Sequence, residues 1–263
     1  MKRYLSPGIF LTAVLLAAMA GCTQYTSVTT ETHSIPENSV VEVSTFNGSI
    51  TVEWYEGSDL FLEVTITANS EAELAEAEVD ITAGALTGIE AYKLDDDARV
   101  GVSLLLRLPH GVEIAELHTS NGRITVSGGS GFAQATTSNG SISFENFSGS
   151  VRAETSNGSV TVSGSDLVYA RSSNGSITGE IMSIPPEGIE LRTSNGAINV
   201  ELNSSLDADI EMNTSNGSVS VTGEGFSSVI IDDSDGTAIL GAGGNSITLR
   251  TSNGSIRIKA VTP

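Results

Sequence analysis

Residues 189–200 read IELRTSNGAINV, and seven other segments of the chain repeat this pattern. The centre of each segment is a corner, Thr-Ser-Asn-Gly or a close variant. The corner asparagines are Asn121, Asn139, Asn157, Asn174, Asn195, Asn216 and Asn253. Asp235-Gly236 fills the one slot in which the asparagine is missing, and successive corners are 17–21 residues apart. A nearly fixed period of this length predicts a chain whose successive turns stack on one another.

Hydrophobic residues alternate with polar residues on both sides of each corner. Ile189 and Leu191 precede the corner, and Ile198 and Val200 follow it. A period of two on both sides indicates two half-buried strands per turn, and β-branched residues suit strands. We therefore predict an all-β fold, a β-solenoid with about eight to nine coils of 17–21 residues.

The Asn-Gly corner has two expected roles. Glycine accepts a positive φ without a Cβ clash, and asparagine tolerates it better than most residues. Equivalent residues of stacked coils lie about 4.8 Å apart, so an asparagine column can hydrogen-bond amide to amide, and the threonine column at the corners can do likewise. Asn-Gly also favours tight hairpins, so an array of hairpins is the structural alternative.

The two ends of the repeats have different predicted features. Residues 39–113 are expected to form an N-terminal coil and a small α/β cap, in which residues 70–80, SEAELAEAEVD, are typical of a capped short helix. Residues 114–263 hold the repeats. The last coil is expected to lie unpaired at the open end, where Arg257 and Lys259 would discourage edge-to-edge association.

The first 22 residues indicate export from the cytoplasm. Lys2 and Arg3 precede an apolar run that is short for a membrane span and typical of a signal peptide. The sequence Met-Ala-Gly-Cys that ends at Cys22 resembles the bacterial lipobox. This resemblance implies that residues 1–21 are removed and that Cys22 is lipidated. A plain secretory signal is the alternative. Cys22 is the single cysteine, so an intrachain disulfide is excluded.

Composition limits the partners. Residues 22–38 are rich in Thr and Ser and predict a flexible tether between membrane and domain. The net charge is −20, and charged residues make up 17% of the chain, against about 25% in typical domains. The acidity reflects a shortage of cations, and the sequence has no basic stripe. Nucleic acid is therefore not an expected partner.

The sequence offers no catalytic constellation. The three histidines are scattered without metal-ligand spacing, and the many serines are explained by the corner. We therefore predict no cofactor and no catalytic residue. Asp232, Asp233 and Asp235 are weak candidates for a calcium site, because several carboxylates lie within a few residues. A solvated loop is the simpler interpretation.

The outward places after the corners form the candidate binding surface. They carry mostly hydroxyl groups, and the candidate residues are Ser141, Ser143, Ser159, Thr161, Ser176, Thr178, Ser218 and Ser220. Such a face can hydrogen-bond glycans, and regular threonine arrays on solenoids can bind ice. Alternatively, small polar residues simply suit a solvated strand.

A family resemblance rests on the segment VSLLLRLPHG running into AELHTSNGRITV at residues 102–126, together with the corners and the lipobox. These features resemble the bacterial putative-adhesin family of unknown function. The resemblance covers about residues 40–263 and implies a right-handed single-stranded β-helix with an envelope role. It transfers no catalytic residue.

The predicted function is that of a non-enzymatic, lipid-anchored envelope protein, either an adhesin or a scaffold. Its expected partners are the membrane, through the N-terminal lipid, and a glycan or an envelope protein, through its solenoid faces. The alternative is a β-helix carbohydrate-active enzyme, either a polysaccharide lyase or a hydrolase.

Overall fold

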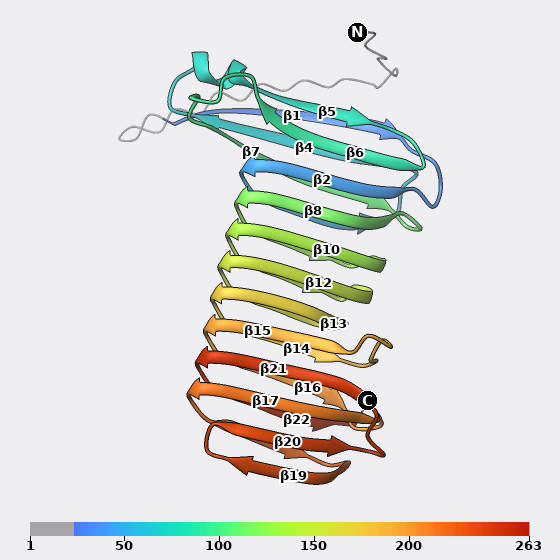
Figure 1. The fold of residues 1–263 in the computed structure, drawn as a ribbon. Coiled ribbons are helices and arrows are strands. Elements are labelled where there is room, and N and C mark those ends of the chain that lie inside the picture. The colour runs from blue at the N-terminus through green and yellow to red at the C-terminus, as the bar shows by residue number, and fades with distance from the viewer. Residues whose placement is uncertain (1–23, 263) are drawn as a thin grey trace. The chain divides into compact units, whose positions relative to one another are not determined.

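The computed structural model describes residues 24–262 as an all-β protein (Figure 1). Its strands belong to a large sheet that is not closed into a barrel. The predicted all-β class is confirmed. The chain divides into two compact units, residues 1–125 and residues 126–263. Each unit is described separately.

The described part of the first unit contains strands and one short 3-10 helix. Its elements are β1 (Tyr25–Ser34), β2 (Val40–Asn47), β3 (Ile50–Tyr55), β4 (Asp59–Ala68), η1 (Ala72–Glu76), β5 (Ala77–Thr82), β6 (Leu86–Lys93), β7 (Val100–Pro109) and β8 (Glu113–Asn121), and β9 (Ile124–Ser127) crosses into the second unit. Parallel pairs join β2 to β6 and β8, and β3 to β7. Antiparallel pairs join β4 to β1 and β7, and β5 to β6. In the segment predicted to form an N-terminal coil, β2 and β3 flank a corner whose Asn47 accepts a hydrogen bond from Asn121.

Two predictions for the first unit are wrong in part. The predicted tether is not free of structure, because Tyr25–Ser34 pairs with β4 over its whole length. The helix predicted for residues 70–80 shrinks to the single 3-10 turn Ala72–Glu76. The expected cap is only partly formed: the Glu73 backbone N–H donates to Ser70 Oγ, but the Glu73 carboxylate accepts from the Asn69 backbone N–H, and Glu71, which caps the 3-10 turn, makes no side-chain capping bond. The following residues pair with β6 as strand β5, and this pairing ends the helix.

Most strands of the second unit flank the Asn-Gly corners, and β19 and β20 form a hairpin. The strands are β10 (Ser130–Asn139), β11 (Ile142–Glu145), β12 (Ser148–Asn157), β13 (Val160–Asn174), β14 (Ile177–Ile181), β15 (Ile189–Asn195), β16 (Ile198–Asn203), β17 (Ala208–Asn216), β18 (Val219–Gly223), β19 (Phe226–Asp232), β20 (Asp235–Leu240), β21 (Asn245–Asn253) and β22 (Ile256–Val261). We call two strands joined by one Asn-Gly corner a corner unit. Each strand of a corner unit pairs in parallel with the strand at the same place in a neighbouring corner unit. A hairpin array would instead give antiparallel pairs across each corner.

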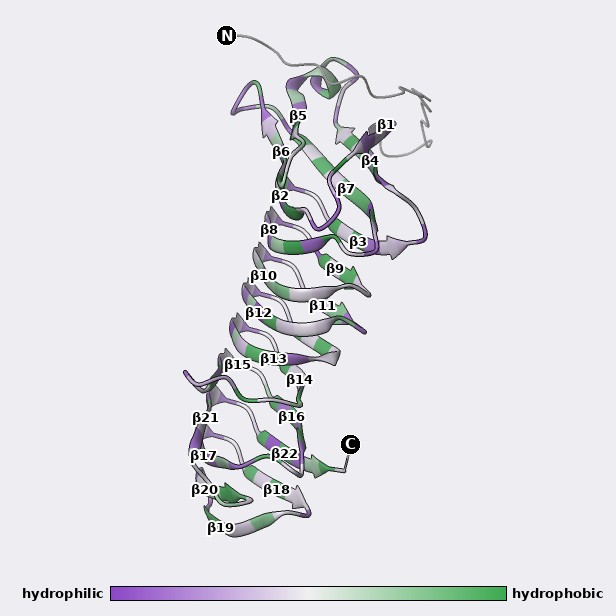
Figure 2. Cartoon of the chain, turned by 90° about the vertical axis from the view of Figure 1, so that its right-hand side faces the viewer, coloured by the Kyte–Doolittle hydropathy of each residue, from purple (hydrophilic) through white to green (hydrophobic). Residues whose placement is uncertain are grey.

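Hydrophobic and hydrophilic residues alternate along these strands (Figure 2). The hydrophobic side chains of this pattern are buried. Ile189, Leu191, Ile198 and Val200, the residues chosen from the sequence pattern, are all buried. The polar residues between them face outward and are exposed or half-buried. Burial of each such side chain contributes about 1.5–3 kcal/mol, so the core of the second unit rests on the period-two pattern.

The corner asparagines form the predicted ladder. In the second unit Asn157 donates to Asn139, Asn174 to Asn157 and Asn195 to Asn174, with Nδ2–Oδ1 distances of 2.8–2.9 Å. The threonine column does not form an equivalent ladder. The buried hydroxyls of Thr155, Ser172, Thr193, Thr214 and Thr251 instead donate to the carbonyl of a corner glycine in a neighbouring corner unit. The distance from Thr193 Oγ1 to the Gly175 carbonyl oxygen is 2.8 Å.

The corner glycines serve close approach, and the prediction that they adopt a positive φ is wrong. Gly158 and Gly175 are not among the residues with positive φ. A Cβ atom built on Gly158 would lie 1.9 Å from the carbonyl oxygen of Gly140 in the neighbouring corner unit. Glycine is required because a neighbouring carbonyl occupies the space of a side chain.

The last corner unit of the sequence lies inside the second unit, not at its end. Strand β21 pairs in parallel with β15 on one side and with β17 on the other, and β22 pairs with β16 and β18 (Figure 1). The chain therefore passes over one strand position between β16 and β17 and later returns to fill it. The prediction that the last coil is unpaired at an open end is wrong.

The Asp235-Gly236 slot is not a corner of the repeat. Strands β19 and β20 form an antiparallel hairpin in which Asp232 and Asp235 are opposite partners, and Asp233 has a positive φ of 41°. Strand β20 also pairs antiparallel with β17 and covers its free edge. Because the hairpin occupies this edge, β21 cannot stack there.

Candidate functional site

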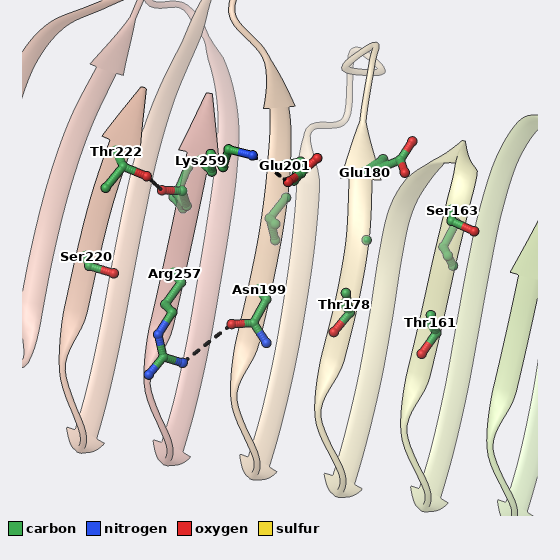
Figure 3. Close-up of a pocket in the computed structure, with 14 residues that line it drawn as sticks. Thr161, Ser163, Thr178, Glu180, Asn199, Glu201, Ser220, Thr222, Arg257 and Lys259 are labelled. Carbon is green, nitrogen blue, oxygen red and sulfur yellow. Dashed lines mark hydrogen bonds and ion pairs between the residues drawn. The ribbon is translucent and has the colours of Figure 1, made fainter. Parts of the chain in front are cut away.

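A groove of about 430 Å³ lies on the outward face of the strands that follow the corners in the second unit (Figure 3). Its walls come from five neighbouring strands, in the order β13, β14, β16, β22 and β18. Paired strands lie about 4.8 Å apart, so the five strands offer side chains over roughly 19 Å. The groove therefore has the shape to accept an extended ligand that crosses the strands.

Two rows of polar side chains line the groove (Figure 3). The first row is Thr161, Thr178, Asn199, Arg257 and Ser220, and the second row is Ser163, Glu180, Glu201, Lys259 and Thr222. Between the rows, the buried side chains of Val162, Val200 and Ile258 belong to the core beneath. Successive side chains along each strand point to opposite faces, so the same strands supply the polar lining of the groove and the hydrophobic core beneath it.

The inserted strand β22 provides the two cations of the groove. Arg257 Nη1 lies 3.5 Å from Asn199 Oδ1, and Lys259 Nζ lies 3.1 Å from Glu201 Oε1. The Lys259 and Glu201 side chains are 60% and 49% exposed. An exposed ion pair of this kind is worth about 0–1 kcal/mol. Both charges therefore remain available to a ligand at little cost.

A local irregularity of β13 positions the acidic end of the groove. The pairing of β13 with β14 shifts register between Thr161 and Asp166. Gly164, with a φ of +63°, turns its N–H toward the Glu180 carboxylate at 3.0 Å. Asp166 meanwhile accepts hydrogen bonds from Met182 and its neighbour Ser183, which hold the following loop. The bulge thus fixes Glu180 at the rim.

The structure separates the eight hydroxyl residues selected from the sequence. Thr161, Thr178 and Ser220 line the groove, and Ser143 is the register partner of Thr161. The remaining four, Ser141, Ser159, Ser176 and Ser218, lie nearer the corners and do not line the groove. The expected row of hydroxyls is interrupted, because Asn199 and Arg257 stand between Thr178 and Ser220.

Sequence reasoning missed the charged residues of the groove, although a signal was present. Glu180, Glu201, Lys259 and Thr222 all lie five residues after a corner glycine. Aligning the corners would have found this second row. The position of Lys259 beside Glu201 could not be found in this way, because it depends on the insertion of β22.

The other candidate residues have simpler placements. Asp235 accepts a hydrogen bond from Asn213, and the described residues hold no group of three or more His, Cys, Asp or Glu side chains arranged for a metal ion. Cys22 lies outside the described residues. Within residues 24–262, no helix has the length and hydrophobicity that a membrane crossing requires.

Comparisons with known proteins give structural resemblances alone. No family model matches the chain, and no curated protein matches it. A "putative cell adhesion protein" from Clostridium sporogenes has 13% identity and a TM-score of 0.33, covering 89% of this chain and 100% of its own. A "putative adhesin" from Bacteroides fragilis has 9% identity and a TM-score of 0.40, covering 89% and 97%. A "putative lipid binding protein" from Parabacteroides distasonis has 14% identity and a TM-score of 0.40, covering 89% and 96%.

Proposed function

We propose that the repeats form a right-handed single-stranded β-helix that serves as a non-enzymatic binding protein of the bacterial envelope. The in-register parallel pairs between corner units support a solenoid. The asparagine ladder supports it too, because stacked amides need equivalent residues on neighbouring turns. Such a scaffold repeats one outward position on every turn, which suits a ligand that is itself a repeating chain.

The ligand proposed for the groove is a linear polysaccharide lying across the strands from β13 to β18. The observation that carries this proposal is the double row of donors and acceptors along the groove. Sugar hydroxyls both donate and accept hydrogen bonds, and the rows offer hydroxyl, amide, carboxylate, ammonium and guanidinium groups. A polymer that crosses several strands can bind several of these groups at once.

The lining also predicts the strength of binding. The described lining residues include no aromatic side chain, so the groove has no platform on which a sugar ring can stack. Binding would rest on hydrogen bonds that compete with water, each worth about 0.5–1.5 kcal/mol. We expect weak binding of short oligosaccharides and stronger binding of longer ones, as several contacts act together.

A glycan array followed by calorimetry tests the proposal. The double variant Asn199→Ala with Arg257→Ala removes two adjacent groups of the first row and should weaken binding of the selected polysaccharide at least tenfold. The matched control is Arg107→Ala, which removes an arginine that contacts Glu53 in the first unit. An equal loss of affinity in the double variant and in the control, or the absence of any bound glycan on the array, would contradict the proposal.

One observation favours the enzyme as a second candidate. Glu180 and Glu201 are register partners on neighbouring strands, and retaining glycosidases use two carboxyl groups about 5–5.5 Å apart. The contact of Glu201 with Lys259 and the exposure of both side chains speak against this role. Release of reducing sugar from the bound polysaccharide, abolished by Glu180→Gln, would establish the enzyme and overturn the non-enzymatic proposal.

The envelope location is proposed from the N-terminal sequence. Lipidation at Cys22 would place several acyl chains on the mature N-terminus and anchor it durably. Expression of Cys22→Ser in a bacterial host, with a labelled fatty acid, tests this. We expect the unaltered protein to carry the fatty-acid label and to be found in the membrane fraction. The variant should carry no label and should be absent from that fraction. Equal membrane association of the two proteins would contradict the anchor.

A further inference from the structure

Three arginines occupy one row on the face formed by the strands that precede the corners. Arg171 on β13 is the register partner of Arg192 on β15, and Arg192 is the partner of Arg250 on β21. All three side chains are exposed. Residues 126–263 contain six Lys and Arg residues in total. Half of the cations of this unit therefore stand on three consecutive strands, and we call them the arginine row.

The arginine row is not explained by the stability of the fold. Like charges directly opposite each other on paired strands destabilise a sheet. Arg250 contacts Glu211, with 3.0 Å between Nη2 and Oε1. The side chains of Arg171 and Arg192 form no hydrogen bond or ion pair with any residue that the structure describes. Two adjacent guanidinium groups are thus left with all their donors free.

The insertion of β21 completes this row. Asn213 of β17 is the register partner of Arg250 on the far side. If the corner units stacked in chain order, Arg192 would face Asn213 and the row would hold two arginines. The same insertion that brings Arg257 and Lys259 into the groove therefore extends a cationic row on the strands preceding the corners.

We propose that the arginine row binds a linear acidic polysaccharide that presents one carboxylate or sulfate to each arginine. A guanidinium group binds carboxylate and sulfate through two parallel hydrogen bonds, and its planar fork fits these anions better than an ammonium group does. Neighbouring arginines repeat about every 4.8 Å, which is close to the length of one sugar unit in an extended chain. This inference does not rest on the proposed function of the groove, whose residues follow the corners, whereas the three arginines precede them.

The residues beside the arginine row limit which polyanions can bind to it. The register row beside the arginines carries Tyr169, Glu190 and Thr248 in the same strands, and Glu211 follows on β17. These carboxylates, with the net charge of −20, oppose a broad polyanionic surface such as a duplex or an anionic bilayer. Glu154 on β12 is the register partner of Arg171 and bounds the arginine row at that end. A single narrow chain can lie along the three arginines between this carboxylate and those of the neighbouring register row.

Calorimetric titration with polygalacturonate, a sulfated glycosaminoglycan and uncharged dextran tests the proposal. We expect one or both acidic polymers to bind and dextran not to bind, and the preferred polymer identifies the anion. Arg192→Gln should weaken acidic polymer binding about tenfold, because it removes the central charged contact. Arg152→Gln is the matched control, since Arg152 lies on the same face over the Tyr169 ring, 5.2 Å from its centroid.

A thermal melt of the same variants distinguishes a loss of affinity from a loss of folding stability. Arg192→Gln relieves the repulsion in the row, so its Tm should equal or exceed that of the unaltered protein while its affinity falls. Equal binding of dextran, unchanged affinity in Arg192→Gln, or a parallel loss in Arg152→Gln would each overturn the proposal. None of these outcomes depends on the groove, because Arg257 is retained throughout.

Discussion

Asn253 and Asn195 are neighbours in the asparagine ladder although they are 58 residues apart in the chain, and Asn253 Nδ2 lies 2.8 Å from Asn195 Oδ1. Asn216, which follows Asn195 in the sequence, donates instead to Asn253 at 3.0 Å. The ladder therefore records the spatial order of the corner units directly. That order places residues from the end of the repeats between two units that are consecutive in the chain.

A disulfide scan tests this order. In a Cys22→Ser background, Asn195→Cys with Asn253→Cys should oxidise readily, since adjacent strands fall within the Cα separation of 4.4–6.8 Å that a disulfide needs. Asn195→Cys with Asn216→Cys should not, because two strand steps amount to about 9.6 Å. A free-thiol assay and mass spectrometry show which of the two double variants forms the disulfide. A bond between positions 195 and 216 would show that the units stack in chain order.

The ladder itself contributes to stability. Asn195 donates to Asn174 and accepts from Asn253, so Asn195→Ala removes two hydrogen bonds and should lower the free energy of unfolding by about 1–3 kcal/mol. Ser194→Ala is the control, because Ser194 is exposed and should change stability by less than about 0.5 kcal/mol. Urea denaturation measures both. Equal midpoints would mean that the amide column is incidental.

The sequence predicts the strands and the core well because each corner unit contains its own complete pattern. Ile189 and Leu191 are buried for the same reason that Ile247 and Leu249 are, namely the period of two before a corner. For the same reason, the sequence does not show the order in which the corner units stack. Equivalent patterns can stack on one another in any order, so no local signal distinguishes β17 from β21 as the neighbour of β15.

The groove and the arginine row were missed for this reason. Arg257 and Arg250 can be recognised from the sequence as outward residues, but their neighbours Asn199 and Arg192 are set by the stacking order. The corner glycine is a second feature whose structural role depends on the stacking of the units. Its presence is plain in the sequence, yet the carbonyl that excludes a side chain belongs to another unit.

The glycine argument predicts a large cost for adding one methyl group. Gly158→Ala places a Cβ atom 1.9 Å from the Gly140 carbonyl oxygen, so the two units must separate at the corner. We expect a loss of more than about 3 kcal/mol. Gly88→Ala in β6 is the matched control, since a Cβ there meets nothing within 4 Å, and it should be neutral or slightly stabilising. Thermal melts would refute the close-approach explanation if both variants behaved alike.

A tyrosine in the first unit gives a pH-dependent prediction. The Tyr92 hydroxyl donates to the Glu78 carboxylate at 2.7 Å, and this hydrogen bond, followed by burial and Asp80, raises the pKa of Tyr92 from 10.0 to about 12. The folded state therefore favours the neutral phenol. Its stabilisation is fully present below pH 10 and is lost as the pH rises toward 12. Burial raises the pKa of Tyr169 as well, so ultraviolet titration of the unaltered protein and of Tyr92→Phe should differ by the loss of one late-ionising tyrosine. Glu78→Gln should bring the pKa of Tyr92 closer to 10.

Two substitutions on neighbouring residues of β16 test whether this strand lies in the middle of a cooperative unit. Ile198 is 0% exposed and packs in the core, whereas Asn199 faces the groove. Ile198→Asp buries a carboxylate without a partner, so it should cost more than about 4 kcal/mol and abolish the cooperative transition of the second unit. Asn199→Asp introduces the same side chain on the outward face, beside Arg257, and should change the free energy of unfolding by less than about 1 kcal/mol. Circular dichroism melts compare them, and similar transitions in the two variants would show that the strand does not hold the register described for β16.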